Sequence, residues 1–206
     1  MILFVCEGNV CRSVIAAGVL QKALRLTQGV TVGSAGTRAL VGERADPVTA
    51  AIASRLGVSL DGHRARQITP ELLASADMVV TATRPIRSAT VQTYPPAVKY
   101  SFTMRQLARI LKAAETGFEA DGLTGPALVT ALSRSLNQEK ARLIAPQGDD
   151  DNIVDPHGRP ARVHEQTAEA IVLAVGELAK ALGGIPVPWL PPRLTQRWEI
   201  PRTAAG

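Results

Sequence analysis

The sequence predicts an α/β protein in which helices cover both faces of a parallel β-sheet. Short apolar runs such as 1–5 and 78–82 are typical of buried parallel strands, and helical patterns separate them. Strands that alternate with helices favour a parallel, doubly wound sheet. At 206 residues the chain fits one compact domain with room for one insertion. Aromatic residues make up only 3% of the chain, so we expect a core of aliphatic side chains.

Each predicted element follows from a local pattern. A helix starts near Ser13, because apolar residues recur every three or four positions after it. Asp46-Pro47 and Thr69-Pro70 each combine an N-capping side chain with a first-turn proline, which predicts two further helix starts. The predicted strands are 1–5, 30–34, 78–82 and 98–100, and the predicted helices are 46–57, 69–73, 84–91, 104–114, 163–182 and the one from Ser13.

Two segments do not fit this alternation. Residues 116–147 are interpreted as a helical insertion, because Leu128, Leu132 and Leu136 indicate one apolar helical face. Residues 183–206 are rich in proline and are expected to form an extended tail. The sequence therefore predicts a domain at 1–182 that carries the insertion, followed by the tail.

The bulk composition excludes several classes of protein. The net charge of +5 suits an anionic partner, although a solvated basic face explains it more simply. No run of basic residues alternates with aromatic residues, so nucleic acid is not an expected partner. The longest apolar stretch, 168–175, is far shorter than the ~20 residues that span a bilayer, so no membrane is expected. Two cysteines in one short loop and the lack of a signal-peptide pattern predict a cytoplasmic protein.

The loop from Cys6 to Ser13, with the sequence CEGNVCRS, joins the first strand to the first helix. Backbone amides in such a turn point inward and the helix N-terminus adds partial positive charge, so the turn is predicted to bind an anion. Arg12 can grip two oxygens of a phosphoryl group with its planar guanidinium. A thiolate is favoured at a helix N-terminus and near arginine, so Cys6 is predicted to be an ionised nucleophile.

A nucleophile of this kind needs a proton donor for the leaving oxygen. Asp155-Pro156 lies in the polar loop 149–160, before the last predicted helix, where a carboxyl can reach the mouth of a cleft. On spacing alone, an ordinary Asp-Pro turn explains the dipeptide equally well. Asp155 is therefore a candidate general acid.

With both features in place, the chain resembles the bacterial low-molecular-weight protein tyrosine phosphatases. The family's loop pattern V-C-x-G-N-x-C-R-S-P is matched by VCEGNVCRSV at 5–14. Further matches, in the family's order, are SAGT at 34–37, DP at 46–47, HRARQIT at 63–69 and DP at 155–156. The resemblance covers about residues 1–112 and 148–182. It implies a three-layer α/β/α fold with a four-stranded parallel sheet.

The resemblance also implies a mechanism. Cys6 would attack phosphorus to give a cysteinyl-phosphate, Arg12 would hold the phosphoryl oxygens, and Asp155 would act first as acid and then as base. Cys11 matches a second loop cysteine that in the family can form a reversible disulfide with the nucleophile. Phosphate-binding or supporting roles are implied for Glu7, Gly8, Asn9, Val10, Cys11, Ser13, Ser34 and His63. No metal or other cofactor is needed.

Two residues depart from the family pattern. Leu40 and His157 stand where aromatic side chains usually wall the substrate groove. We therefore expect a phosphorylated protein or a small phosphoester as substrate, with phosphotyrosine in doubt. Two alternatives stay open: an arsenate reductase that uses an external thiol, and a non-catalytic phosphate-binding module. A homodimer formed through the insertion or the tail is a further hypothesis.

Overall fold

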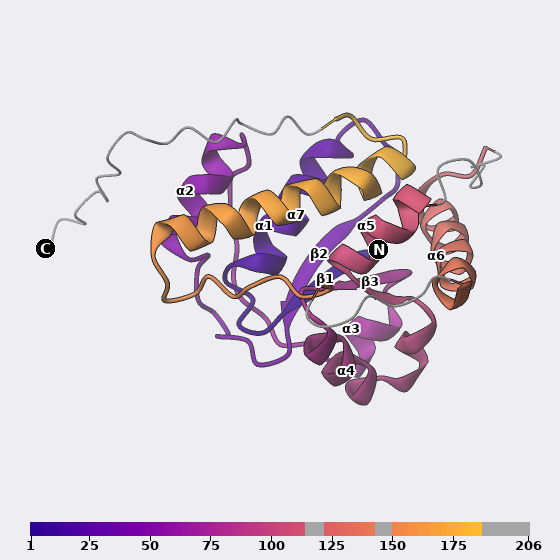
Figure 1. The fold of residues 1–206 in the computed structure, drawn as a ribbon, viewed down its shortest axis with the longest axis horizontal. Helices are drawn as coiled ribbons and strands as arrows, with labels where there is room; N and C mark the ends of the chain where they lie inside the picture. Colours follow the sequence, from indigo (N-terminus) through magenta and orange to yellow (C-terminus); the bar gives the residue numbers. More distant parts are fainter. Residues whose placement is uncertain (114–121, 143–149, 187–206) are drawn as a thin grey trace, which may run out of the picture.

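A four-stranded parallel sheet forms the centre of the computed structural model, which describes residues 1–113, 122–142 and 150–186. The strands lie in the order β2-β1-β3-β4, and Figure 1 labels the first three of them. They are β1 (Ile2–Cys6), β2 (Val32–Gly36), β3 (Met78–Thr81) and β4 (Ser101–Thr103), each parallel to its neighbours. The predicted α/β class with a four-stranded parallel sheet is confirmed.

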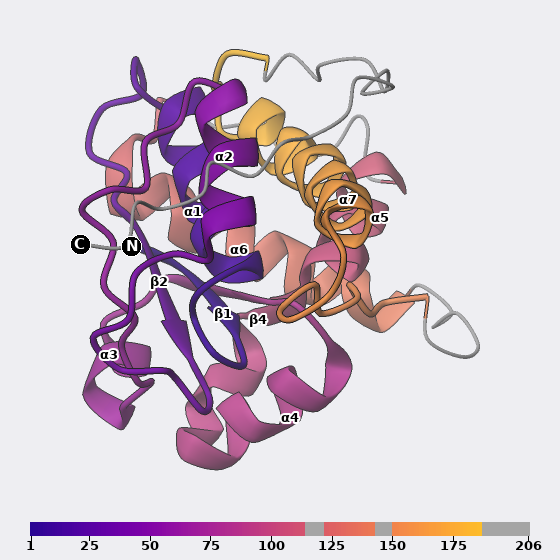
Figure 2. The ribbon, with the colours of Figure 1, turned by 90° about the vertical axis from the view of Figure 1, so that its left-hand side faces the viewer.

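Helices cover both faces of this sheet, as Figure 2 shows. One face carries α1 (Arg12–Ala23), α2 (Pro47–Arg55), α5 (Met104–Ala113) and α7 (Ala161–Ala181), and the other carries α3 (Pro70–Ala74) and α4 (Arg84–Thr93). The long helix α7 packs against α1, α2 and α5. This arrangement is the predicted three-layer α/β/α fold.

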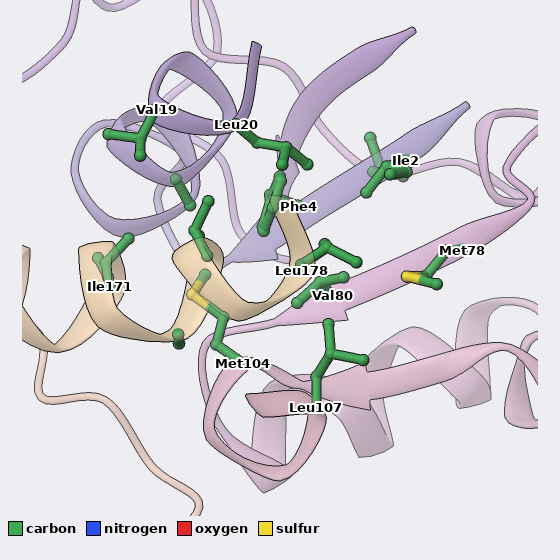
Figure 3. Close-up of a cluster of buried hydrophobic side chains, with 14 of the residues drawn as sticks. Ile2, Phe4, Val19, Leu20, Met78, Val80, Met104, Leu107, Ile171 and Leu178 are labelled. Carbon is green, nitrogen blue, oxygen red and sulfur yellow. The ribbon is translucent and has the colours of Figure 1, made fainter. Parts of the chain in front are cut away.

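The core lies between the sheet and the layer that contains α7. Phe4 of β1 and Val80 of β3 point toward Leu178 of α7, and Leu107 of α5 closes the cluster (Figure 3). All five residues of β1 are buried, as expected of a central strand with helices on both sides. The core is mainly aliphatic, with Phe4 and Phe102 as its fully buried aromatic members.

The N-terminal signals of the helices are confirmed, whereas one strand prediction is wrong. The side chain of Asp46 accepts hydrogen bonds from two backbone amides of α2, and Thr69 caps α3 in the same way. Residues 98–100 do not form a strand, because Pro95 and Pro96 start a 3-10 helix that runs from Pro95 to Lys99. The fourth strand follows at 101–103, and β2 begins two residues later than predicted.

The predicted insertion contains α6 (Gly125–Arg142), which contacts α5 and β3. Its predicted apolar face is buried in the core, at Leu128, Leu132 and Leu136. The hydroxyl of Thr130 also donates to the Asp77 carboxylate at 2.9 Å. Both flanks of α6, at 114–121 and 143–149, and the tail beyond residue 186 lie outside the described residues. Within the described ranges, no helix has the length and apolar character needed to cross a bilayer.

Candidate active site

The loop from Cys6 to Arg12 lies at the carboxyl edge of the sheet, where parallel α/β proteins bind their ligands. Cys6 is the last residue of β1 and pairs with Gly36 of β2, and α1 begins at Arg12. A Cβ atom at Gly36 would lie 2.3 Å from the carbonyl oxygen of Glu7. Glycine is therefore required there, because the loop packs directly on the end of β2.

The sulfur of Cys6 receives two polar contacts. The backbone amide of Asn9 donates to Sγ at 3.2 Å, and Oγ of Ser13 lies 3.0 Å from it. Because the Asn9 side-chain amide donates to that same Oγ at 2.9 Å, the hydroxyl hydrogen of Ser13 is left to point at the sulfur. Both contacts stabilise negative charge on Cys6, at the N-terminus of α1.

Hydrogen bonds of Asn9 hold the loop from Cys6 to Arg12 in its conformation. The φ of Asn9 is 56°, a left-handed conformation that asparagine tolerates better than most residues. Its side-chain amide also donates to Ser34 at 3.0 Å, and its side-chain carbonyl accepts from the backbone amide of Arg66 at 2.9 Å. His63 Nε2 lies 2.7 Å from the Asn9 backbone carbonyl. The structure thus brings the predicted support residues Asn9, Ser34 and His63 together behind the loop.

His63 is held in its neutral form. Burial lowers its pKa from the ordinary value, with a smaller contribution from the positive charges of Arg64 and Arg66, against the hydrogen bond to Asn9. Near pH 7 the neutral form of the ring is therefore favoured, in which only one of the two ring nitrogens carries a hydrogen. That hydrogen must be on Nε2, because the Asn9 carbonyl can only accept.

Arg12 reaches from the loop toward the segment before α7. Its side chain is only 4% exposed, and Nη1 donates to the carbonyl of Ile153 at 3.2 Å. Nη2 forms an ion pair with the carboxylate of Asp155. Among the described residues, nothing accepts a hydrogen bond from the buried Nε. A buried guanidinium with an unused N–H is suited to grip an oxyanion.

The segment that carries Asp155 is anchored by a buried carboxylate, Asp151. Its oxygens pair with Arg84 of α4 at 2.9 Å and with Arg109 of α5 at 2.7 Å. Burial disfavours the charge of Asp151, but the hydrogen bonds from Arg109 and Arg84 outweigh it and lower the pKa. The amide of Ile153 then donates to the carbonyl of Ala82, which fixes the segment beside β3.

A pocket of about 330 Å³ opens beside the loop. It is lined by Cys6, Glu7, Gly8, Val10, Cys11, Arg12, Arg38, Leu40, Asp155, His157 and Arg159. The structure thus places the predicted nucleophile, phosphate-binding arginine and acid in one pocket, with both predicted groove residues. None of these lining residues is Phe, Tyr or Trp.

Cys11, the second cysteine of the loop, is buried in its reduced form. Burial raises its pKa to about 12, and the negative charges of Asp46 and Asp155 add to the effect, against a hydrogen bond with Thr49. Cys11 is therefore a thiol near pH 7.

Several residues of the site were not found by sequence reasoning. Arg159 lines the pocket, and Asp151 anchors the acid segment, but neither belongs to a local motif. Arg84 pairs with Asp151, and Arg87 donates to the carbonyl of Ser101. An acidic run at 149–151 was the one visible signal for the anchor.

The fold and the loop define an α/β/α protein with a cysteine at the turn between its central strand β1 and the helix α1. The family model of the low molecular weight phosphotyrosine protein phosphatases matches residues 1–116, and the chain belongs to this family. Its sequence is 48% identical over 80 residues to the low molecular weight protein-tyrosine-phosphatase Wzb of Salmonella typhi. The aligned residues make up 39% of this chain and 52% of Wzb. For Etp of Escherichia coli (strain K12) the identity is 44% over 79 residues. This alignment covers 38% of this chain and 51% of Etp. The chain thus spans about half the length of these curated relatives.

Solved structures share the fold beyond that matched region. Wzb of Vibrio vulnificus in complex with benzylphosphonate has a TM-score of 0.63 at 23% identity, covering 87% of this chain and 96% of that one. The YwlE arginine phosphatase from Geobacillus stearothermophilus has a TM-score of 0.63 at 26% identity, covering 88% and 92%.

Proposed function

We propose that this chain hydrolyses phosphomonoesters through a cysteinyl-phosphate intermediate. The observation that carries the proposal is the geometry of one loop. Two hydrogen-bonding groups point at Cys6 Sγ, and the buried Arg12 guanidinium lines the same pocket with an unused N–H. The names of the curated relatives, which are protein-tyrosine-phosphatases, support the same activity.

In the first step the Cys6 thiolate attacks phosphorus, so that a P–S bond forms and the P–O bond to the leaving alcohol breaks. Arg12 and the loop amides hold the other three oxygens, where negative charge accumulates. The phosphoryl group replaces Asp155 as the partner of Arg12. The displaced carboxylate takes up one proton from solvent and passes it to the leaving oxygen.

In the second step Asp155, now a carboxylate, takes a proton from water. The water oxygen attacks phosphorus, the P–S bond breaks, and the sulfur of Cys6 leaves as a thiolate with the electron pair. Inorganic phosphate is released and Asp155 is protonated again. No group is oxidised or reduced in either step.

The proposed substrate is a phosphorylated protein or a small phosphoester. Arg38 and Arg159 line the pocket, and none of the described residues that line it is a large aromatic, which supports recognition of negative charge over stacking on a phenyl ring. A cytoplasmic location, supported by the two free cysteines, is part of the same proposal. So is a homodimer formed through the insertion or the tail.

Parallel assays of the purified chain test this function. We expect hydrolysis of p-nitrophenyl phosphate that Cys6→Ser abolishes, and negligible thiol-coupled reduction of arsenate. Arsenate turnover without ester hydrolysis would assign the chain to the reductases. Phosphate binding without any turnover would make it a binding module. Unchanged hydrolysis in Cys6→Ser would place the nucleophile elsewhere.

A further inference from the structure

Three side chains next to the pocket form a cluster that the mechanism above does not use. Cys11 precedes α1, Asp46 precedes α2, and His157 lies in the loop before α7. One ligand atom from each, namely a sulfur, a carboxylate oxygen and a ring nitrogen, lies within 4.8 Å of the others. The fold therefore brings three different metal-ligand types together from three separate segments.

Asp46 is held rigidly with one oxygen available. Its Oδ1 accepts hydrogen bonds from the amides of Val48 and Thr49 at 3.0 and 3.1 Å, and its own amide donates to the carbonyl of Val10. Its Oδ2 is 3.5 Å from Nδ1 of His157, too far for a good hydrogen bond. The carboxylate and the imidazole thus converge at ion-pair distance, without a hydrogen bond between them.

The environment of Cys11 favours a cation. The thiol is buried, is in no disulfide and makes a hydrogen bond with Thr49, and the negative charges of Asp46 and Asp155 act on it. The positive charge of the adjacent Arg12 is already paired with Asp155. A divalent cation between Cys11 and Asp46 would have the negative charge of the Asp46 carboxylate directly beside it.

We propose that Cys11, Asp46 and His157 form a zinc site beside the catalytic loop, and that bound zinc inhibits the enzyme reversibly. Sulfur, nitrogen and oxygen ligands at ~2.0–2.3 Å are those that Zn²⁺ takes, and water supplies a fourth position. The three ligand atoms already lie within 4.8 Å of one another, and the exposed His157 side chain can move to bring them closer. When the Zn–S bond forms, the thiol proton goes to solvent. A thiolate ligand selects zinc over magnesium or calcium.

The inhibition follows from where the ligands lie, and this part rests on the proposed phosphatase function. His157 is two residues after Asp155, and both line the pocket together with Cys11. The His157 side chain is 53% exposed, so it is free to adjust toward the metal. Zinc would then link the segment that carries Asp155 and His157 to the loop that carries Cys11. This link would restrict the movement of Asp155 away from Arg12.

Binding is tested without relying on activity, in Cys6→Ser protein, whose single remaining thiol is Cys11. Titration with Co²⁺ as a spectroscopic probe should give a thiolate-to-cobalt charge-transfer band, which Zn²⁺ then removes by competition. Adding His157→Gln or Asp46→Asn should weaken binding at least ~10-fold, a loss that even outer-shell substitutions reach. Asn still caps α2, and His157 is exposed, so both variants should fold; far-UV circular dichroism checks this.

Glu43→Gln is the matched control, because it removes one exposed negative charge from the loop that precedes Asp46 and should leave binding unchanged. A missing charge-transfer band, or a band that survives both His157→Gln and Asp46→Asn, would overturn the site. In otherwise unaltered enzyme, Zn²⁺ should inhibit p-nitrophenyl phosphate hydrolysis, and a chelator should restore the activity. His157→Gln should make the enzyme less sensitive to inhibition by Zn²⁺. Cobalt binding in a protein that hydrolyses no ester would keep the site and reject the function.

Discussion

The carboxylate of Asp155 and the guanidinium of Arg12 form an ion pair, so the candidate acid and the candidate phosphate-binding group are each other's partners. Their exposure differs greatly, at 4% for the Arg12 side chain and 39% for that of Asp155. When an oxyanion arrives, the carboxylate is therefore the group that can move away. The pair keeps the buried charge of Arg12 compensated until substrate replaces Asp155.

Replacement of Asp155 by asparagine should separate chemistry from binding. Asparagine has the same shape but can neither give a proton to the leaving oxygen nor take one from water, so kcat for p-nitrophenyl phosphate should fall by ~10²–10⁴. Inorganic phosphate should inhibit the variant more strongly, because Arg12 no longer faces a competing negative charge. Asp150→Asn, an exposed acid in the same segment, is the control. An unchanged kcat would assign the acid elsewhere.

Asn9 offers a test of the loop's backbone. Asn9→Gly keeps the left-handed conformation but removes three side-chain hydrogen bonds, each worth about 1 kcal/mol. Asn9→Ala loses the same bonds and adds roughly 1–2 kcal/mol for a left-handed residue with a Cβ. Urea unfolding should therefore give the stability order wild type, Asn9→Gly, Asn9→Ala. Equal stability of the two variants would mean that the loop does not need its positive φ.

Asp151→Asn should destabilise the protein by about 2–3 kcal/mol near neutral pH, somewhat less than a fully buried pair because both arginines are partly exposed. The pKa of Asp151 is lowered in the folded state, so its contribution is complete above the ordinary value of about 3.9 and is lost as the pH falls through the lowered value. The gap between wild type and variant in urea unfolding should narrow below about pH 4. A gap independent of pH would rule out an ionised anchor.

The lining of the pocket indicates that the enzyme has little preference for phosphate esters of aromatic alcohols such as phosphotyrosine. A panel of phosphotyrosine peptides, phosphoserine peptides and small phosphoesters should show phosphotyrosine without a clear advantage in kcat/KM, because Leu40 and His157 offer no large ring for stacking. His157→Tyr should raise the relative rate with phosphotyrosine. Clear dominance of phosphotyrosine in the unaltered protein would contradict this reading of the groove.

Local signals predicted those parts of the structure that depend on neighbours in sequence. The buried run at β1, the N-caps Asp46 and Thr69 and the loop at 6–13 are such features. The 3-10 helix at 95–99 was missed because the apolar residues after Pro96 were interpreted as a strand. Asp151 and its arginines are separated by 67 and 42 positions, and no local pattern reports such pairing. In the sequence, Arg12 and Asp155 belong to two separate motifs. Only the folded structure shows that their side chains form an ion pair.

The central claim, that Cys6 accepts the phosphoryl group, is tested most directly by trapping the intermediate. Asp155→Asn retains the nucleophile but lacks the base that activates water, so the cysteinyl-phosphate should accumulate with p-nitrophenyl phosphate. Rapid quenching and mass spectrometry of the peptides should locate one phosphoryl group on Cys6, and none in the corresponding Cys6→Ala protein treated in the same way. A phosphoryl group on another residue, or steady hydrolysis with no adduct at all, would contradict the mechanism.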